Sequence, residues 1–576
     1  MVFNIEVNNR LLQARQGETI LMALRRNGIY VPTLCNMKDY TPTGACRMCV
    51  VEIEGKANLT PSCSFLVEDW MKISTHSPRV LQARKTIVEL LLSNHPDDCL
   101  YCERNGNCEL QVLAENLNIR ERRIPGKKSA LKIDKSSPGI VRDPAKCILC
   151  GRCVRICEEM QAVSCFDFSN RGSDLIIATA MAKPLNFSNC INCGQCVMAC
   201  PTAALTEKIQ FEEISDALHR PEKMLVAQYS PTVSVSLAEE FGFKGGKDIN
   251  GIINAALRKI GFKKVYESSF AADVNVLEMA EEFFRRREKG ENLPLITGDC
   301  PAWIKYAEQF IPEFLSYITT VKSPQQITGS LIKTWISDKE KINPSDIFSV
   351  SIMPCTAKKF EGQRVEMTRK GISDIDTVLT TRELARLIRL HGIDIEQLEP
   401  EPSDAPMEGV SSSGKLFGTS GGVLESLLRT IYYKSTGAEL DDTKLPKLRN
   451  NKAVREVQLN IGNADLNVIA VSGISHAIRI LEEVRTGKKQ YDIIEIMACP
   501  GGCIAGGGQP VSFDPDFKAK RIQGIYNADK QLELHKSQDN PYVKELYQMT
   551  LGEIGGHKAH SLLHTHYHGR KRITDQ

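Results

Sequence analysis

The 576-residue sequence lacks three features, and each absence excludes a class of protein. No apolar run approaches the ~18 residues that a membrane-spanning helix needs. The first residues have no basic stretch followed by an apolar one, as a secretory signal would. Neither sign of charge is in excess, because 73 basic and 70 acidic residues leave a net charge of +3. We therefore expect a cytoplasmic protein with neither a membrane nor nucleic acid as partner.

Cysteine, by contrast, is plentiful in a chain whose 42% hydrophobic and 25% charged residues are typical of a globular protein. Sixteen of the 20 cysteines lie before residue 201, and four lie between residues 300 and 503. A reducing cytoplasm disfavours disulfides, which leaves zinc or iron–sulfur clusters as the alternatives. The spacing of the cysteines favours iron.

The first cysteine set is a looser variant of the plant-type [2Fe–2S] spacing, with a zinc site as the alternative. It consists of Cys35, Cys46, Cys49 and Cys63. FNIEV and VVEIEG alternate like strands, and TILMALRRNG has the pattern of a short helix, so we expect a small β-rich domain around this set.

The second set resembles the His/Cys3 [4Fe–4S] site of the electron-input module of respiratory complex I. Its members are His95, Cys99, Cys102 and Cys108, in HPDDCLYCERNGNC. A single histidine at such a position could simply face solvent or cap a helix. The three clustered cysteines beside it favour a ligand.

The third and fourth sets repeat the bacterial two-cluster ferredoxin pattern, C-x2-C-x2-C-x3-C, and give the strongest signal in the chain. In this pattern the fourth cysteine of each run binds the other cluster. One cluster is then expected on Cys147, Cys150, Cys153 and Cys200, and the other on Cys190, Cys193, Cys196 and Cys157. Cys165 is left over, and we interpret it as a buried bystander. Each of the first four sets would thus hold one accessory cluster.

After about residue 222, apolar strand-like segments alternate with amphipathic helices, which predicts α/β layers with parallel sheet. KMLVAQYSP and DIFSVSIMPC are expected strands that end in loops. Sites in such folds lie beyond the carboxyl ends of strands. The remaining cysteines, which suit one further [4Fe–4S] cluster, are Cys300 in TGDCPAW, Cys355 in MPCTAKKFE, and Cys499 and Cys503 in ACPGGC.

These three motifs, in this order, resemble the signatures of the [FeFe]-hydrogenases. Together with the four upstream sets, they resemble the accessory-cluster form of that family, as in the monomeric clostridial enzymes. The resemblance covers essentially the whole chain. It implies an H-cluster, in which the four cysteines hold a [4Fe–4S] cluster and Cys503 bridges it to a two-iron subsite with CO, cyanide and an azadithiolate. At this cofactor, protons and electrons become H2.

The resemblance also implies roles for residues around the cofactor. Lys358 would place its ammonium against an iron-bound cyanide, and Thr232 stands where a serine would contact cyanide. The glycines at 501–502 and 506–508 would allow a close approach of the backbone to the cofactor. The expected pocket lining consists of Pro324, Gln325, Met353, Phe417 and Met497.

The sequence departs from the family in its proton relay. Asp299 stands where the family has a second cysteine, and Met279 stands at the inner carboxylate position of the preceding helix. Glu282 remains as the outer carboxylate, and Thr319 replaces a serine. Either a carboxylate relay runs past Met279 through water and keeps turnover, or the path is cut and the enzyme is slow.

The expected fold is α+β and multidomain: a β-grasp [2Fe–2S] domain, a small His/Cys3 [4Fe–4S] domain, a two-[4Fe–4S] ferredoxin domain, a two-lobed α/β hydrogenase domain with parallel-rich sheets, and a small-subunit-like segment. In this order, the expected ranges are 1–79, 80–125, 138–209, 210–519 and 520–576. We expect the C-terminal segment to be solvated and partly helical, without metal bound to its histidines, which are His557, His560, His564, His566 and His568.

Several functions remain open beside a ferredoxin-dependent hydrogenase. One is a slow H2 sensor, and another is the hydrogenase subunit of an NAD(P)-linked, electron-bifurcating complex with flavin- or NAD(P)-binding partner subunits. An electron-input subunit of a dehydrogenase fits only the first 200 residues, and an iron–sulfur assembly factor fits only the second half. The two-iron subsite would also require maturation proteins.

Overall fold

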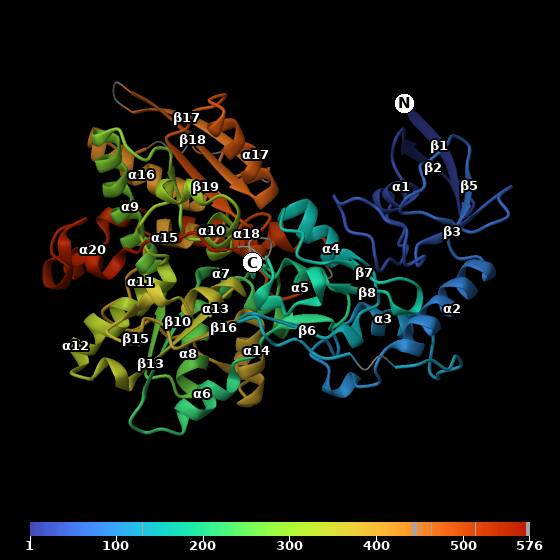
Figure 1. The fold of residues 1–576 in the computed structure, drawn as a ribbon, viewed down its shortest axis with the longest axis horizontal. Coiled ribbons are helices and arrows are strands. Elements are labelled where there is room, and N and C mark those ends of the chain that lie inside the picture. Colours follow the sequence, from blue (N-terminus) through green and yellow to red (C-terminus); the bar gives the residue numbers. More distant parts are fainter. Residues whose placement is uncertain are drawn as a thin grey trace.

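The computed structural model describes residues 1–128, 131–440, 445, 447–450, 452–461, 464–512 and 514–571. The N-terminal domains lie to one side of a larger body, from residue 210 onward, which we call the catalytic body after the role that the resemblance implies (Figure 1). Among the described residues, no helix is both long and apolar enough to cross a membrane.

The first domain is a mixed five-stranded sheet with one helix packed on it. The strand order is β2-β1-β5-β3-β4, and only the β1–β5 pair is parallel. Helix α1 (Ile20–Arg26) starts at Thr19, whose hydroxyl accepts a hydrogen bond from the backbone N–H of Met22. The strands are β1 (Val2–Val7), β2 (Arg10–Arg15), β3 (Val50–Ile53), β4 (Thr60–Pro61) and β5 (Lys72–Ser74).

The second region is helical and is tied to the first domain. Helix α2 (Pro78–Asn94) packs against α3 (Glu109–Asn116). The buried Arg84 on α2 donates to the carbonyl oxygens of Met48 and Val50, at 3.1 and 2.8 Å, and so joins α2 to the edge of β3.

The ferredoxin-like region contains the internal repeat that the sequence predicts. Helices α4 (Arg152–Arg155) and α5 (Gln195–Ala199) each follow a glycine in the left-handed region, with φ of 70° at Gly151 and 71° at Gly194. Glycine adopts this conformation without steric cost. The region's short antiparallel pairs are β6 (Ile140–Arg142) with β9 (Leu205–Glu207), and β7 (Asp167–Ser169) with β8 (Ile176–Ala178).

The catalytic body contains two four-stranded sheets. The first is fully parallel, in the order β11-β10-β13-β16. The second has the order β12-β19-β18-β17, and only its edge strand β17 is antiparallel. The strands are β10 (Met224–Tyr229), β11 (Lys264–Glu267), β12 (Leu295–Ile296), β13 (Ile347–Met353), β16 (Thr377–Thr380), β17 (Val454–Ile461), β18 (Ala464–Ser472) and β19 (Ile493–Met497).

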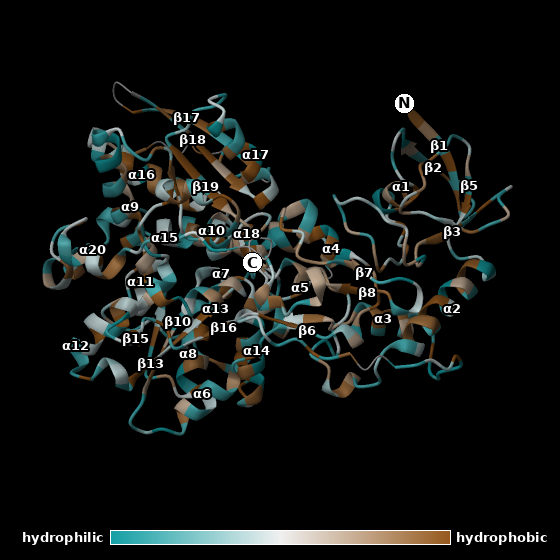
Figure 2. Ribbon diagram, viewed as in Figure 1, coloured by the Kyte–Doolittle hydropathy of each residue, from teal (hydrophilic) through white to brown (hydrophobic). Residues whose placement is uncertain are grey.

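Helices lie between and around the two sheets, and strands such as β18 and β19 are largely apolar (Figure 2). This arrangement confirms the predicted mixed α and β content with parallel sheets. The main helices are α8 (Asn250–Ile260), α9 (Ser269–Lys289), α10 (Pro301–Phe310), α11 (Pro324–Leu331), α13 (Ala357–Gly362), α14 (Thr381–Leu390), α15 (Ser412–Leu416), α16 (Gly422–Thr436) and α17 (Ile474–Arg485).

The C-terminal segment forms α18 (Phe517–Gln531), α19 (Pro541–Leu546) and α20 (His557–Leu563). The segment is partly helical, as expected, and His557, His566 and His568 are exposed. The expectation of a solvated tail was wrong for the rest, because these helices bury apolar residues against the catalytic body. Leu546 and Leu563 are fully buried in its core, and the buried Arg521 forms an ion pair with Glu239. Burying this apolar surface is what fixes the segment in place.

A cavity lined by four cysteines and a single buried lysine

The candidate site lies where loops from both sheets meet. Cys355 follows the carboxyl end of β13 and Cys499 follows that of β19, as expected for sites in parallel sheets. Cys300 follows β12 at the start of α10, and Cys503 lies in the next loop after Cys499. All four border one cavity. Cysteines up to 203 residues apart in sequence, from Cys300 to Cys503, are therefore brought together by the two sheets.

The chemistry of these four thiols fits a metal cluster. None of the described cysteines forms a disulfide. Burial raises the pKa of Cys355 to about 12, and it also raises the pKa of Cys300, Cys499 and Cys503. Free thiols in this setting would stay protonated at neutral pH, whereas bound iron stabilises the thiolate. The donor set therefore fits an iron–sulfur cluster better than a nucleophile.

Lys358 lies in the wall of this cavity, and its ammonium is held by two polar side chains. Its Nζ donates to Ser323 Oγ at 2.8 Å and to Glu361 Oε2 at 2.9 Å. Burial alone would lower the pKa of Lys358, but the Glu361 carboxylate keeps it above its ordinary value. Gln325 donates to the same Glu361 oxygen at 2.9 Å. Sequence reasoning missed Glu361, although its i,i+3 spacing from Lys358 on a helix was a usable signal.

The five predicted lining residues border the cavity, and Thr232, the predicted cyanide contact, does not. Pro324, Gln325, Met353, Phe417 and Met497 lie in its wall. Thr232 lies one layer further out.

Ser230 borders the cavity where Thr232 was expected, and its Oγ is 2.9 Å from Thr232 Oγ1.

The predicted glycines do not all lie at the cavity. Gly502 and Gly506 border the cavity, whereas a Cβ on Gly507 would meet the Cys193 carbonyl oxygen at 2.5 Å. Gly507 thus permits contact with the ferredoxin-like region rather than with the cavity.

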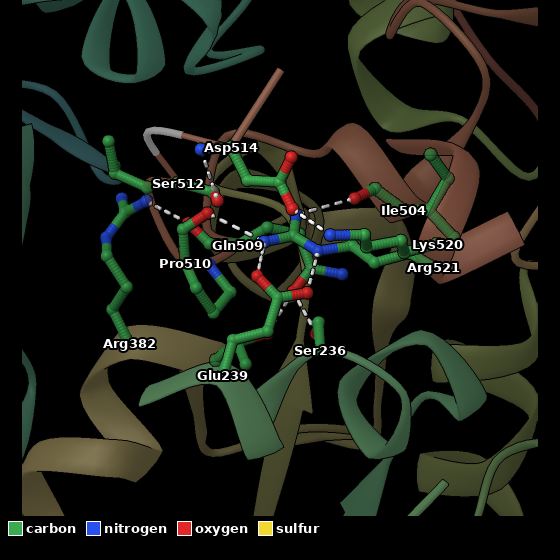
Figure 3. Close-up of polar contacts among 12 residues, drawn as sticks. Ser236, Glu239, Arg382, Ile504, Gln509, Pro510, Ser512, Asp514, Lys520 and Arg521 are labelled. Carbon is green, nitrogen blue, oxygen red and sulfur yellow. Dashed lines mark hydrogen bonds and ion pairs between the residues drawn. The ribbon is translucent and has the colours of Figure 1, made fainter. Parts of the chain in front are cut away.

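The loop that carries Cys503 is clamped from several elements (Figure 3). Gln509 Oε1 accepts hydrogen bonds from Ser236 at 2.6 Å and Thr381 at 2.8 Å, and its Nε2 donates to the Cys503 carbonyl oxygen at 3.3 Å. Arg521 on α18 donates to the Ile504 carbonyl oxygen at 3.0 Å. The C-terminal segment therefore helps to fix a loop of the site.

Asp299 also faces the cavity. Asn275 on α9 donates to its Oδ1 at 3.1 Å, and its Oδ2 is buried without a hydrogen-bond partner. Burial raises the pKa of the Asp299 carboxyl to about 7, and the Lys358 ammonium opposes this shift. Sequence reasoning missed Asn275, since nothing in the helix pattern indicates which of its residues faces Asp299.

Helix α9 orients its carboxylates in different directions. Met279 is fully buried in the apolar core. Glu278 accepts hydrogen bonds from Tyr547 and, at 3.0 Å, from His564, so it faces the C-terminal segment. Glu282 accepts from Thr319 Oγ1 at 2.6 Å and lies beside a second, solvent-facing cavity. The structure thus brings Glu282 and Thr319 together, whereas the side-chain partner of Asp299 is Asn275.

The cysteines of the first accessory set are also brought together. The thiols of Cys35, Cys46 and Cys63 lie in contact, and Cys49 contacts Cys63. In the second set, His95 caps the C-terminal end of α2, and its Nδ1 is buried without a hydrogen-bond partner. Cys102 lies near Cys108, and Cys99 is exposed.

In the ferredoxin-like region the fourth cysteines cross over. Cys200 lies near Cys150, and both interact with Cys153. One small cavity is bordered by Cys157 and by three cysteines of the second run, which are Cys190, Cys193 and Cys196. Cys165 borders the same cavity.

Family models match the chain along most of its length. "Iron only hydrogenase large subunit, C-terminal domain" matches residues 223–507, and "Iron hydrogenase small subunit" matches 515–570. Upstream, a 2Fe–2S iron–sulfur cluster binding domain matches 2–78, the iron–sulfur binding region of NADH-ubiquinone oxidoreductase-G matches 84–123, and a 4Fe–4S dicluster domain matches 146–204.

The similarity to two curated proteins covers nearly the whole chain. NADP-reducing hydrogenase subunit HndD of Solidesulfovibrio fructosivorans is 40% identical over 99% of this chain and 100% of its own length. Iron hydrogenase 1 of Clostridium pasteurianum is 36% identical over 98% and 99%. A structure of the [FeFe]-hydrogenase HydA1 from Chlamydomonas reinhardtii, 32% identical, matches 62% of this chain and 98% of its own with a TM-score of 0.57. This chain belongs to the iron-only, or [FeFe], hydrogenase family.

Proposed function

We propose that this hydrogenase interconverts H2 with protons and electrons at an H-cluster held by Cys300, Cys355, Cys499 and Cys503. The observation that carries the proposal is the shared cavity of these four buried cysteines, Lys358 and Asp299. When bound, such a cofactor supplies the redox chemistry that joins two protons and two electrons. Cys503 is the ligand that would bridge to the two-iron subsite.

The remaining wall residues bind and enclose the cofactor. Lys358 offers a buried ammonium to an anionic ligand such as cyanide, and Glu361 and Ser323 fix its position. Met353, Met497 and Phe417 exclude water. The set is completed by Pro324 and Gln325 in the wall, and by Thr232, which supports Ser230.

Protons are exchanged with the cavity by Asp299. Its unpartnered Oδ2 can accept or donate a proton, and Asn275 holds the other oxygen. At the outer end, Glu282 and Thr319 connect to the solvent-facing cavity. Met279, which stands at the family's inner carboxylate position and is buried in the apolar core, cannot carry a proton, so a connection between the two ends requires water beside that side chain.

Electrons move through the N-terminal domains, which we propose to hold one [2Fe–2S] and three [4Fe–4S] clusters on the cysteines and histidine of the four sets. The proposed domains are 1–79, with a β-grasp fold, 80–125, 138–209, 210–519 and the small-subunit-like 520–576. We place the protein in the cytoplasm, with ferredoxin or another redox protein as partner and with maturation proteins for the two-iron subsite.

A second candidate is the hydrogenase subunit of an NAD(P)-linked complex. It is favoured by the full-length similarity to a protein named as a subunit of an NADP-reducing hydrogenase. The discriminating test is H2-dependent reduction of NADP⁺ by the protein alone, by the protein with ferredoxin, and by a complex purified from its own host. Reduction by the complex only would favour the subunit reading.

The primary test uses protein matured anaerobically with the diiron subsite supplied. We expect infrared bands from bound CO and cyanide, and H2 evolution from a reduced artificial donor. Bands without turnover would mean that the proton path is cut, and would favour a sensor. Absence of the bands after supply of the subsite would overturn the assignment of the cavity.

A further inference from the structure

Gln195 connects two of the proposed cluster sites. It is the first residue of α5 in the ferredoxin-like region, and only 5% of its surface is exposed. Its side-chain Nε2 donates to Cys499 Sγ at 3.2 Å and to the Ala505 carbonyl oxygen at 2.9 Å. Both amide hydrogens are thus used by the catalytic body.

The backbone of the same residue faces the other cluster site. The N–H of Gln195 donates toward the sulfur of Cys193. Cys193 borders the small cavity of the ferredoxin-like region, and Cys499 borders the large cavity of the catalytic body. One residue therefore contacts a proposed sulfur ligand on each side through an N–H group.

The loop that carries Gln195 is fixed by close backbone contacts. A Cβ on Gly194 would meet Thr356 Oγ1 at 2.4 Å and Gly507 Cα at 2.9 Å. Thr356 Oγ1 also donates to the Asn192 carbonyl oxygen at 2.7 Å. Because Thr356 and Gly507 belong to loops of the catalytic cavity, these contacts fix the position of the Gln195 side-chain amide relative to that cavity.

We propose that Gln195 is a positioning residue that raises the reduction potential of the four-iron part of the H-cluster and couples it to the neighbouring ferredoxin-type cluster. This inference rests on the proposed function. Hydrogen bonds to cysteine sulfur disperse negative charge and so stabilise the reduced cluster. The path from Cys193 through Gln195 to Cys499 contains only covalent bonds and two N–H···S contacts.

The test compares Gln195→Leu with Gln161→Leu. Gln161 is a matched control, since it is also a buried glutamine of the ferredoxin-like region and donates to the Ala498 carbonyl oxygen at 2.9 Å, but to no sulfur of the catalytic body. The readout is an infrared titration of the CO and cyanide bands against applied potential. At the wild-type midpoint, we expect the ratio of reduced to oxidised cluster to fall three- to tenfold in Gln195→Leu, where tenfold equals about 59 mV for one electron.

A second readout separates electron transfer from chemistry at the cofactor. Exchange of D2 with water needs no external electrons, so its rate should change less than twofold in Gln195→Leu. H2 evolution driven through the accessory clusters should fall several-fold in the same variant. An equal decrease in D2 exchange and in H2 evolution would contradict the role of Gln195 in coupling the two clusters.

The outcomes also separate this inference from the proposed function. Wild-type protein without CO bands would refute the H-cluster itself. Wild-type bands together with an unchanged midpoint in Gln195→Leu, or an equal shift in Gln161→Leu, would refute only the role of Gln195. If Gln195→Leu does not assemble, Gln195→Glu serves instead, because it keeps the shape, removes the N–H donor and should lower the midpoint further.

Discussion

At the scale of single residues, Asp299 distinguishes this hydrogenase from the usual pattern of its family. Its carboxylate faces the cavity, and one oxygen has no partner. We predict that Asp299→Asn lowers H2 evolution by about 10²-fold or more, because an amide cannot relay protons. The infrared bands of the cofactor should persist, since Cys300 and its loop keep their geometry. Unchanged evolution with intact bands would show that another group carries the proton.

The outer end of the path offers a comparison between neighbouring threonines. Thr319 donates to Glu282, whereas the hydroxyl of Thr320 contacts His564 at 2.7 Å. Replacing Thr319 with valine removes a hydroxyl at almost constant volume, so we predict a tenfold or larger loss of H2 evolution. Thr320→Val leaves the Thr319–Glu282 contact intact, so it should change the rate of H2 evolution less than threefold. Equal losses would point to a structural effect of this turn. A solvent isotope effect on both variants checks that proton transfer is the step affected.

At the scale of elements, β9 and α14 are joined by an ion pair that also reaches the site. Arg382 donates to Glu207 Oε2 at 2.8 Å and to the Gly507 carbonyl oxygen at 2.8 Å. Burial would raise the pKa of Glu207, but the Arg382 and Arg386 guanidiniums hold it well below its usual range. The pair therefore contributes stability above the ordinary glutamate pKa of ~4.3, and this contribution is lost only as the pH falls below it.

We predict that Glu207→Gln destabilises the protein by about 3 kcal/mol, because it leaves a buried guanidinium without its charge partner. The resulting drop in the melting temperature should be constant between pH 6 and 8, where Glu207 stays ionised. The control is Glu482→Gln, which removes an exposed pair with Arg485 and should change the melting temperature little. A drop that varies with pH in this range would contradict the assigned pKa.

The sequence predicted these elements where local pattern determines them. The apolar runs around β10 and β13 specified buried parallel strands, and the cysteine spacing specified the ferredoxin repeat. It could not determine which way each residue of α9 faces. Glu278 and Glu282 are separated by one helical turn, yet one bonds to His564 and the other to Thr319. That choice depends on contacts with segments about 40 to 290 residues away, which local pattern does not contain.

The same reason explains the errors around the cavity and in the C-terminal segment. The family resemblance placed Thr232 at the cofactor, and the turn after β10 brings Ser230 to the cavity wall with Thr232 hydrogen-bonded behind it. The C-terminal histidines are polar in sequence, but His564 is buried because Glu278 and Thr320 satisfy its two ring nitrogens. A buried polar group with partners supplied by distant elements gives no local signal.

At the scale of the whole molecule, the five proposed cluster sites lead to a simple iron inventory. One [2Fe–2S], three [4Fe–4S] and one six-iron H-cluster predict about 20 iron atoms per chain. We predict that Cys102→Ala removes about four of them, because the His/Cys3 set cannot hold its cluster on three ligands without loss of affinity. The catalytic CO bands should remain.

Cys165 supplies the matched control for this inventory. It is buried like a ligand, and its backbone N–H donates to Cys157 Sγ at 3.3 Å. Its own thiol contacts Ser188 Oγ at 3.2 Å and the thiol of Cys190, but the four crossed ligands of that cavity are complete without it. Cys165→Ala should therefore keep all the iron, as measured by metal analysis and by the electron paramagnetic resonance of the reduced clusters. If Cys165→Ala lost about four irons, Cys165 would be a ligand in place of one crossed cysteine. If Cys102→Ala lost none, the second set would not bind a cluster, and electrons would have to reach the ferredoxin-like region by another route.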